Sequence, residues 1–256
     1  MTIPLQQKIV YGPINSRRLG RSLGINLLPI SLKVCTFNCV YCQYGWTRVH
    51  DYQLPEESMW PPVEQVIEEV KKALQKIQSP PDYITFSGNG EPSLHPAFIQ
   101  LVDEIIQLRD LYARASLTAI LSNSTTIHDS SIRTAIAKLD APIMKLDCGN
   151  EKCLKLYNRP CKGFNYTEML SGLAQLKKVT IQTLFTEGPE GNFYPENISN
   201  WIERLKKISP RQVQIYTLDR GHPSDEIFPV VKEKLLAVRD QLRQENINAE
   251  VYTRER

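Results

Sequence analysis

The sequence predicts one α/β domain in which a parallel sheet of six strand–helix units curls into a partial (β/α)6 barrel. Short β-rich segments alternate with amphipathic helical segments along the chain. No proline- or glycine-rich linker is long enough to separate two domains. Polar or cysteine-containing loops follow the predicted strands, where parallel α/β folds place their ligands.

The strands are predicted from short, apolar, β-rich runs bounded by turn or helix signals. In chain order they cover residues 22–28, 82–87, 117–122, 142–147, 179–185 and 212–218. The clearest helix spans residues 63–78, where apolar side chains recur on one face and Glu68, Glu69, Lys71 and Lys72 lie on the other. Further helices are expected at 96–112, 130–139 with Asp129 as cap, 168–178 after Thr167, 197–208 after Pro195, and 225–245.

The whole chain, 1–256, is expected to form this single domain. Residues 1–30 would supply a lead-in strand, 31–220 the core barrel, and 221–256 a C-terminal helix and tail. Apolar residues make up 41% of the chain and charged residues 23%, which excludes a disordered or fibrous protein. No apolar run reaches the roughly 18 residues of a membrane span, and the N-terminus lacks the features of a signal peptide. The expected protein is cytoplasmic, with no membrane partner.

Positive charge is concentrated at the N-terminus. The net charge is only +3, but residues 1–50 contain six Lys or Arg residues and no Asp or Glu. An anionic group is therefore expected near this segment, with Arg17, Arg18 and Arg21 as candidate partners.

Cys35, Cys39 and Cys42 lie within eight residues inside the same acid-free segment. Without a secretion signal, such a group favours metal binding or catalysis over disulfides. A four-iron cluster normally takes four cysteines, so three would leave one iron open to a small molecule. Zinc is the alternative, with His50 completing a Cys3His site.

The loop Ser87-Gly88-Asn89-Gly90-Glu91 follows the next predicted strand. Its glycines remove side chains where the backbone can approach a ligand closely. Glu91 can accept a charge-assisted hydrogen bond from an ammonium group. A tight strand-to-helix turn is the structural alternative.

The Cys-x3-Cys-x2-Cys triad, Tyr41 before its last cysteine, and the Gly-Glu-Pro loop together resemble the radical S-adenosylmethionine (SAM) enzymes. The resemblance implies that Cys35, Cys39 and Cys42 hold a [4Fe-4S] cluster whose open iron chelates SAM. It also implies that residues from Ser87 through Gly88, Asn89 and Gly90 to Glu91 hold the methionine amino group. Tyr41 would contact the adenine, and Ser122 and Asn123 the ribose. The first glycine of the usual Gly-Gly-Glu is replaced here by Asn89.

Such enzymes reduce the sulfonium of SAM, and the resulting 5'-deoxyadenosyl radical takes hydrogen from a substrate. Lys145 and Asp147 alternate with apolar neighbours along the fourth predicted strand, so both are expected to face the interior. Gln182 and Tyr216 on the last two strands complete the candidate catalytic set. Thr183, Gln214 and Asp219 are further polar candidates on these strands. A hydrogen-bonded interior position is the alternative for each.

Cys148, Cys153 and Cys161 raise the question of a second cluster, because Lys152, Lys155, Arg159 and Lys162 lie among them. The alternative is three ordinary packed thiols.

Tyr11 to Gly24, with Lys145-Leu-Asp147 and Tyr216 to Arg220, is similar to the small iron–sulfur oxidoreductase branch that includes the wyosine-forming tRNA enzymes. Those enzymes carry extra cysteines before the triad, and this chain has none before Cys35. Because the net charge is modest, the sequence favours an oxidoreductase or lyase that modifies a ribosomal precursor peptide, including splicease-type backbone excision. A separate peptide-recognition protein and a flavodoxin or ferredoxin as electron donor are the expected partners. A tRNA substrate and a non-enzymatic zinc module are the alternatives.

Overall fold

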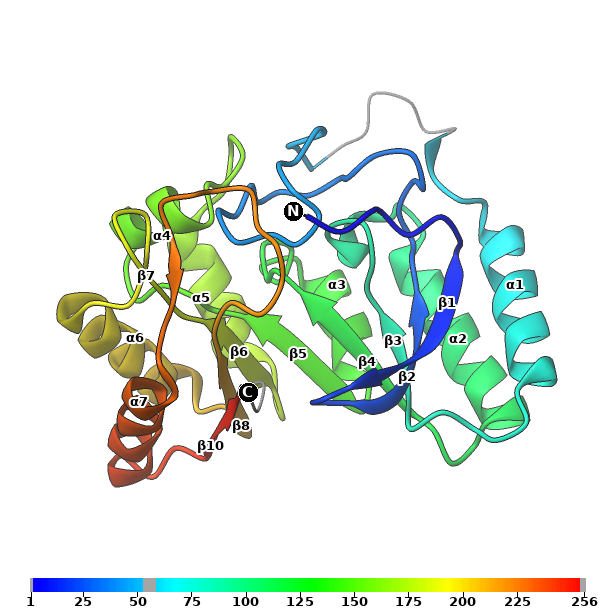
Figure 1. Cartoon of the computed structure of the whole chain (residues 1–256). Helices are drawn as coiled ribbons and strands as arrows, with labels where there is room; N and C mark the ends of the chain where they lie inside the picture. The colour runs from blue at the N-terminus through cyan, green and yellow to red at the C-terminus, as the bar shows by residue number, and fades with distance from the viewer. Residues whose placement is uncertain (1, 53–58, 254–256) are drawn as a thin grey trace.

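The computed structural model describes residues 2–52 and 59–253. The main sheet has the strand order β1-β2-β3-β4-β5-β6-β8-β10. All neighbours from β2 to β10 are parallel, and the sheet curls into an open barrel (Figure 1). These strands are β2 (Gly20–Ile25), β3 (Tyr83–Phe86), β4 (Leu117–Ser122), β5 (Ala141–Lys145), β6 (Thr180–Leu184), β8 (Gln212–Tyr216) and β10 (Ala249–Tyr252). The predicted α/β partial barrel is confirmed.

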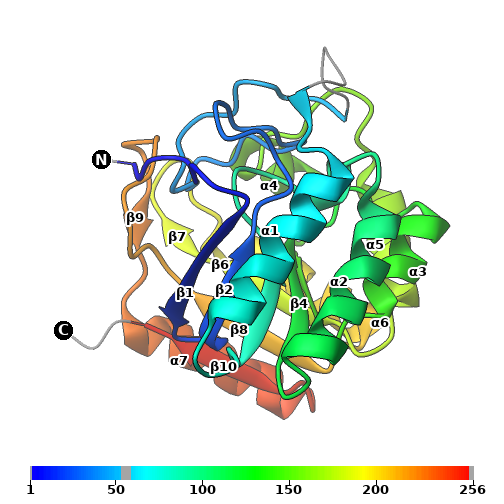
Figure 2. The ribbon, with the colours of Figure 1, turned by 90° about the vertical axis from the view of Figure 1, so that its right-hand side faces the viewer.

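The helices cover the outer face of the curled sheet. Figure 2 shows α1, α2, α3 and α5 on one side of the strands, with β1 on the other. Their bounds are α1 (Val63–Lys76), α2 (Phe98–Tyr112), α3 (Ser130–Ala137), α4 (Glu151–Tyr157), α5 (Tyr166–Gln175), α6 (Pro195–Ile208) and α7 (Lys232–Gln244). None of the helices within the described ranges is long and apolar enough to cross a bilayer.

Four helices begin away from their predicted starts. The helices predicted at 96–112 and 197–208 begin at Phe98 and Pro195. The helix predicted at 168–178 begins at Tyr166, because the Asn165 side chain accepts hydrogen bonds from the backbone N of Thr167 and Glu168 and so caps it. The helix predicted at 225–245 begins at Lys232. Before it, β9 (Phe228–Pro229) pairs antiparallel with β7 (Thr186–Glu187).

Besides β7 and β9, two strands and one α-helix were not predicted. The strand β1 (Val10–Ser16) pairs antiparallel with β2, and most of its residues are exposed, so it lacks the apolar pattern of a buried strand. The seven-residue helix α4 is too short for a periodic signal. The strand β10 lies in the segment predicted as a helix and tail, and it extends the sheet beyond β8.

The core lies between the strands and the outer helices. Trp201 of α6 is fully buried, contacts the ring of Phe185, and donates its indole N–H to the backbone oxygen of Leu146. Burying one such side chain stabilises the fold by about 1.5–3 kcal/mol. Successive side chains of a strand point to opposite faces of the sheet, so polar residues that alternate with the core residues point to the inner face.

Candidate active site

The cysteine loop follows β2 and is fastened to its neighbours by backbone hydrogen bonds. The N–H of Val34 donates to Asn89 at 3.0 Å, and the N–H of Cys35 donates to Val49 at 3.1 Å. A turn in which the Cys42 N–H donates to the Cys39 carbonyl at 3.2 Å keeps the last two cysteines near each other. The sequence spacing is therefore converted into one group of thiols at the end of β2.

Each sulfur has a polar neighbour from a different part of the chain. Asn123 Nδ2 lies 3.3 Å from Cys35 Sγ, and Asn158 Nδ2 lies 3.3 Å from Cys39 Sγ. The third neighbour is Lys33, which is attracted by all three sulfurs and donates a hydrogen bond to Cys42. Burial alone lowers the pKa of Lys33, but this attraction outweighs burial and raises that pKa.

Two of the thiols, Cys35 and Cys39, are held in the protonated form in the absence of metal. Burial raises the pKa of Cys35 to about 12 and that of Cys39 to about 11. At neutral pH both thiols would stay protonated, because their pKa values lie well above that pH. The thiolate is the form that binds metal. Metal loading must therefore release their protons.

The described residues do not assemble the Cys3His zinc site that was the alternative in the sequence. Zinc requires its ligands at about 2.3 Å from a common centre. Within residues 2–52 and 59–253, no three His, Cys, Asp or Glu side chains are placed to share one ion. His50, the predicted fourth zinc ligand, is not brought into such a set, although its Nε2 atom is buried without a hydrogen-bond partner in the described chain. A four-iron cluster spans several atoms, so its three cysteine ligands need not share one centre.

The glycine loop approaches the cysteine loop itself. Gly90 has φ +144°, and a Cβ there would lie 1.7 Å from the backbone oxygen of Val34. A Cβ on Gly88, with φ +136°, would lie 2.4 Å from Oδ1 of Asn26. The two glycines thus allow close contact with the protein's own chain, and the approach of a ligand to this loop stays a prediction.

Glu91 is buried and its two carboxylate oxygens are already engaged. Oε1 accepts from the backbone N and hydroxyl of Ser93, and Oε2 accepts from the backbone N of Asn123 at 2.5 Å. Burial raises the pKa of Glu91, although these hydrogen bonds oppose the rise. The carboxylate thus fixes the end of β4 against the glycine loop. Its role toward a SAM ammonium group remains a prediction.

The hydrogen bonds of the Asn89 side chain give a structural reason for asparagine in place of the first glycine of Gly-Gly-Glu. Its amide accepts from Gln6 N at 2.7 Å and donates to the Gln6 carbonyl at 3.0 Å and to the Pro29 carbonyl at 2.9 Å. A glycine here would lose this clamp on the N-terminal segment. Ser87, at the start of the loop, shares a 2.6 Å hydrogen bond with the hydroxyl of Tyr11.

The end of β4 contributes Ser122 and Asn123. The Ser122 hydroxyl accepts from Ser124 N at 3.0 Å, so it orders the turn. The Asn123 amide donates to Thr36 Oγ1 at 2.9 Å as well as to the Cys35 sulfur. The structure thus brings the predicted ribose-contacting position beside the first cysteine.

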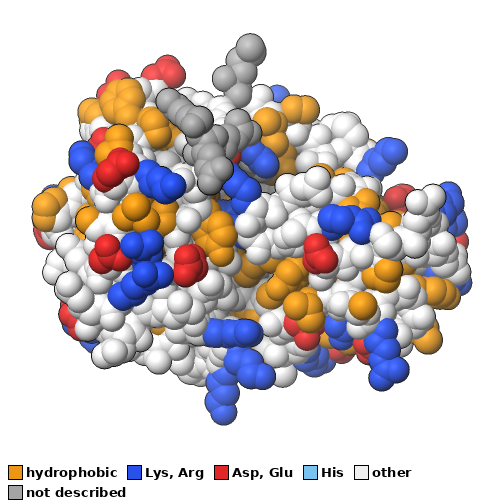
Figure 3. Space-filling model, turned by 60° about the horizontal axis from the view of Figure 1, so that its bottom comes forward, with side chains coloured by type: hydrophobic (Ala, Val, Ile, Leu, Met, Phe, Trp, Pro, Cys, Tyr) orange, Lys and Arg blue, Asp and Glu red, His pale blue; other side chains and the backbone are white. Residues whose placement is uncertain are grey.

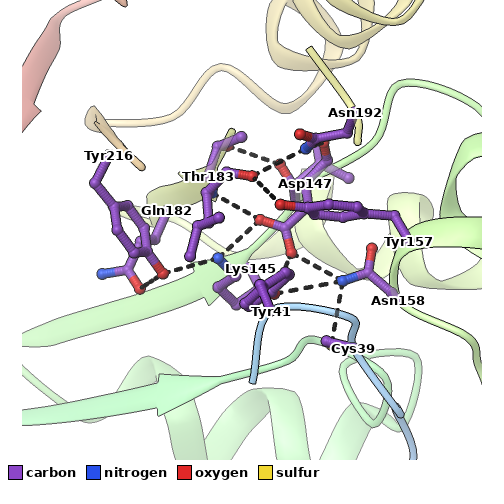
Figure 4. A network of polar contacts seen from close by, with 12 residues as sticks. Cys39, Tyr41, Lys145, Asp147, Tyr157, Asn158, Gln182, Thr183, Asn192 and Tyr216 are labelled. Carbon is purple, nitrogen blue, oxygen red and sulfur yellow. Dashed lines mark hydrogen bonds and ion pairs between the residues drawn. The ribbon is translucent and has the colours of Figure 1, made fainter. Parts of the chain in front are cut away.

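Asp147 is the centre of the polar network on the inner side of the sheet (Figure 4). Oδ1 forms an ion pair with Lys145 Nζ at 2.7 Å and accepts from Leu184 N at 2.9 Å. Oδ2 accepts from the hydroxyl of Tyr41 and from Asn158 Nδ2. The carboxylate is therefore bonded on all sides, and it orients its neighbours.

The register of three strands continues this network into the barrel. Lys145, Gln182 and Gln214 lie opposite one another across β5, β6 and β8. The Lys145 ammonium contacts the Tyr216 hydroxyl at 3.0 Å, and that hydroxyl donates to Gln182 Oε1 at 3.1 Å. The Gln182 amide in turn donates to Gln214 at 3.1 Å. The four predicted catalytic residues thus form one connected group.

Charge fixes the protonation of this group. Burial by itself lowers the pKa of Lys145, but Asp147 and Tyr216 outweigh it and raise that pKa, so the side chain is an ammonium ion. Burial, and then the charge of Asp147, raises the pKa of Tyr41 well above its usual range. Tyr41 therefore acts as a hydrogen-bond donor to the carboxylate.

The expected anion partners Arg17, Arg18 and Arg21 lie elsewhere. Arg17 and Arg18 precede the start of β2, whereas the cysteine loop follows its end, about 20 Å along the strand. Arg17 pairs with Asp219, Arg18 lies 4.5 Å from the centre of the Tyr216 ring, and Arg21 donates to Ser79. The cation beside the sulfurs is Lys33.

The remaining cysteines do not gather into a second metal site among the described residues. Cys148 and Cys153 are buried and their sulfurs touch, whereas the Cys161 backbone is bonded to Thr36. Thr183 donates to a backbone oxygen inside the sheet.

Sequence reasoning missed Lys33 and Asn158. Lys33 carried a signal, since it is a charge two residues before the first cysteine in the acid-free segment. Asn158 carried none, because it follows the unpredicted helix α4.

A family model described as the radical SAM superfamily matches residues 30–192, a span that contains the cysteine loop, the glycine loop and Asp147.

The chain belongs to the radical SAM superfamily. It is accordingly an enzyme of a family that uses SAM and an iron–sulfur cluster.

This radical SAM chain is similar in sequence to curated proteins of different length. It is 33% identical over 219 residues to a protein named GTPase Obg from Brachyspira hyodysenteriae, covering 84% of this chain and 31% of that protein. It is 32% identical over 241 residues to a UPF0026 protein of Methanocaldococcus jannaschii, covering 91% of this chain and 72% of that protein. The chain thus spans about a third of the first relative. No glycine in its sequence is followed by lysine, so it has no Walker-type phosphate loop.

Solved radical SAM enzymes share the fold. A methyltransferase from Sphaerobacter thermophilus has a TM-score of 0.66 at 12% identity, covering 90% of this chain and 65% of that one. SuiB from Streptococcus suis, bound to SAM, has 0.64 at 15%, with coverage of 90% and 50%. TYW1 with a lysine–pyruvate adduct has 0.62 at 16%, with coverage of 89% and 74%. At these identities the likeness shows the fold alone.

Proposed function

We propose that this protein reductively cleaves SAM at a [4Fe-4S] cluster and uses the 5'-deoxyadenosyl radical to abstract hydrogen from a substrate. Cys35, Cys39 and Cys42 would hold the cluster. The observation that carries the proposal is that polar donors from three segments lie at these three sulfurs, inside the span that the family model matches. When bound, the cluster and SAM supply the electron transfer and the radical. An electron donor such as a flavodoxin or ferredoxin would complete the reaction.

The residues of the chain would divide the remaining work. The loop from Ser87 to Glu91 and the end of β4 at Ser122 and Asn123 would position SAM. Tyr41 would lie at the adenine. Lys145, Gln182 and Tyr216 would bind and orient the substrate, while Asp147 holds Lys145 and Tyr41 in place.

The cluster is tested by comparing two buried cysteines. We expect wild-type protein purified without oxygen to contain about four irons and four sulfides per chain and to form 5'-deoxyadenosine after reduction. Cys39→Ala should lose most of the iron, whereas the control Cys161→Ala should keep it. Absence of sulfide from the wild type would favour a zinc module, and about eight irons would restore the second cluster.

We further propose a ribosomally made precursor peptide as substrate, presented by a separate peptide-recognition protein. Several cations are matched by carboxylates, in the pairs Arg17 with Asp219, Lys145 with Asp147, and Arg159 with Glu190. On the face shown in Figure 3, Lys and Arg side chains are interspersed with Asp and Glu. This face does not show a broad basic surface of the kind that binds phosphates. A solved structure of SuiB holds a precursor peptide, which is consistent with this substrate class.

Isotope transfer tests the substrate class directly. Cells grown in heavy water supply a deuterated peptide fraction and a deuterated tRNA fraction, and each is incubated with reduced enzyme and ordinary SAM. We expect 5'-deoxyadenosine to gain deuterium from the peptide fraction. Deuterium from the tRNA fraction would assign an RNA substrate, and deuterium from neither would exclude both.

A further inference from the structure

Lys33 is a buried cation with no carboxylate partner among the described residues. Its residue is 4% exposed, and its ammonium donates to the backbone oxygen of Gly45 at 2.8 Å. The backbone around it is fixed as well, because the Val49 N–H donates to the Lys33 carbonyl at 3.2 Å. A charge buried in this way needs an anionic partner to offset the loss of its hydration.

The cysteines supply this partner once a metal has displaced their protons, because protonated thiols are neutral. The ammonium lies near Cys42, Cys35 and Cys39, and Cys42 accepts a hydrogen bond from it. Asn123 and Asn158 direct their amide N–H groups at the other two sulfurs, each at 3.3 Å. Three donors from three segments thus face three sulfurs, one donor to each.

We propose that Lys33, Asn123 and Asn158 form a donor shell around the cluster ligands, and that the fixed charge of Lys33 sets the reduction potential. The inference rests on the proposed cluster. Reduction adds one electron to an already anionic site, so a nearby cation and N–H···S hydrogen bonds stabilise the reduced form more than the oxidised form. The donor shell therefore raises the potential toward the range that a biological electron donor can reach.

The acidic side chains that face this group act in the opposite direction. Glu91 lies near Cys35 and Asp147 lies near Cys39, and both repel negative charge on those sulfurs. Lys33 is the charge that counters them within the loop. Arg48, the basic residue that follows the triad in the acid-free segment, is exposed and serves as a matched control.

The test is a potentiometric titration of the anaerobic, SAM-free protein, followed by the electron paramagnetic resonance of the reduced cluster. Lys33→Met and Lys33→Gln should each lower the equilibrium constant for reduction at least tenfold, which is about 59 mV for a one-electron couple. Lys33→Arg should restore the wild-type midpoint, since it keeps the charge. Arg48→Met should leave the midpoint unchanged, because solvent screens that position.

The outcomes are separable. A wild type without iron and sulfide removes the proposed function itself. Full iron content with an unchanged midpoint in Lys33→Met and Lys33→Gln overturns only the role of Lys33, as does an equal shift in Arg48→Met. If all three Lys33 variants fail to hold iron, Lys33 serves loop folding and the proposal is also overturned.

Discussion

At the scale of single residues, the site is governed by how each buried polar atom is satisfied. Asp147 illustrates this, because its two oxygens take four contacts within the described chain and the side chain has no solvent exposure. Its nearest cation, Lys145, has a side chain only 14% exposed. Removing one member of such a pair leaves a buried charge alone, which costs more than the pair contributes.

Asp147→Asn is therefore expected to lower the free energy of unfolding by about 3 kcal/mol, in the range measured for broken buried pairs. Anaerobic urea unfolding measures the loss. The double variant Lys145→Met with Asp147→Asn removes both charges and should recover part of the stability. Equal stability of Asp147→Asn and the wild type would contradict the buried ion pair.

The site residues that belong to a spaced motif or to an alternating strand pattern could be predicted from the sequence. The three cysteines, the glycine loop and the interior positions Lys145 and Asp147 follow from motif and strand alternation. The use of Glu91 for Ser93 and Asn123 was not predictable, because it depends on how a side chain turns after the backbone has folded.

At the scale of elements, the two loops at the end of the sheet depend on close backbone approach. Gly90 and Gly163 both have positive φ, but only Gly90 is crowded, since a Cβ on Gly163 would meet nothing within 4 Å. Substitution of Gly163 therefore tests backbone strain alone, whereas substitution of Gly90 tests strain together with a steric clash.

Gly163→Ala is expected to cost about 1 kcal/mol, the penalty of left-handed backbone alone. Gly90→Ala should cost at least about 3 kcal/mol, because its Cβ would collide with the Val34 carbonyl and push the cysteine loop away. Iron content after reconstitution and thermal unfolding measure both effects. If Gly90→Ala holds iron as well as Gly163→Ala does, the loop contact is not required for the cluster.

Elements with strong local signals were found close to their predicted bounds. Residues 117–122 form β4 as predicted, and Asp129 caps α3 by accepting from Ser131 N and Ile132 N. Elements without such signals were missed, including the exposed strand β1 and the short helix α4. Their existence depends on tertiary pairing, which local patterns do not carry.

At the scale of the whole molecule, we expect the core to form without metal. The main apolar cluster joins the strands to the outer helices, and the cysteine loop is fastened by backbone bonds to α4, the glycine loop and Val49. Cluster binding should add stability to a fold that already exists.

Removal of iron with a chelator is expected to leave the far-ultraviolet circular dichroism nearly unchanged. We expect the melting temperature to fall by about 2–8 °C, which corresponds to about 1–2 kcal/mol for a chain of this size. Loss of the helical signal on chelation would show that the loop is needed to hold the barrel together.

The Asn158 side chain has a consequence for communication inside the protein. Its Nδ2 group has two hydrogens but three acceptors within reach, at Cys39 Sγ, the Tyr41 hydroxyl and Asp147 Oδ2. If the sulfur of Cys39 became more negative, the amide would be drawn toward it and its bond to Asp147 would weaken. Reduction of a cluster held by Cys39 would then change the contacts of the carboxylate that binds Lys145.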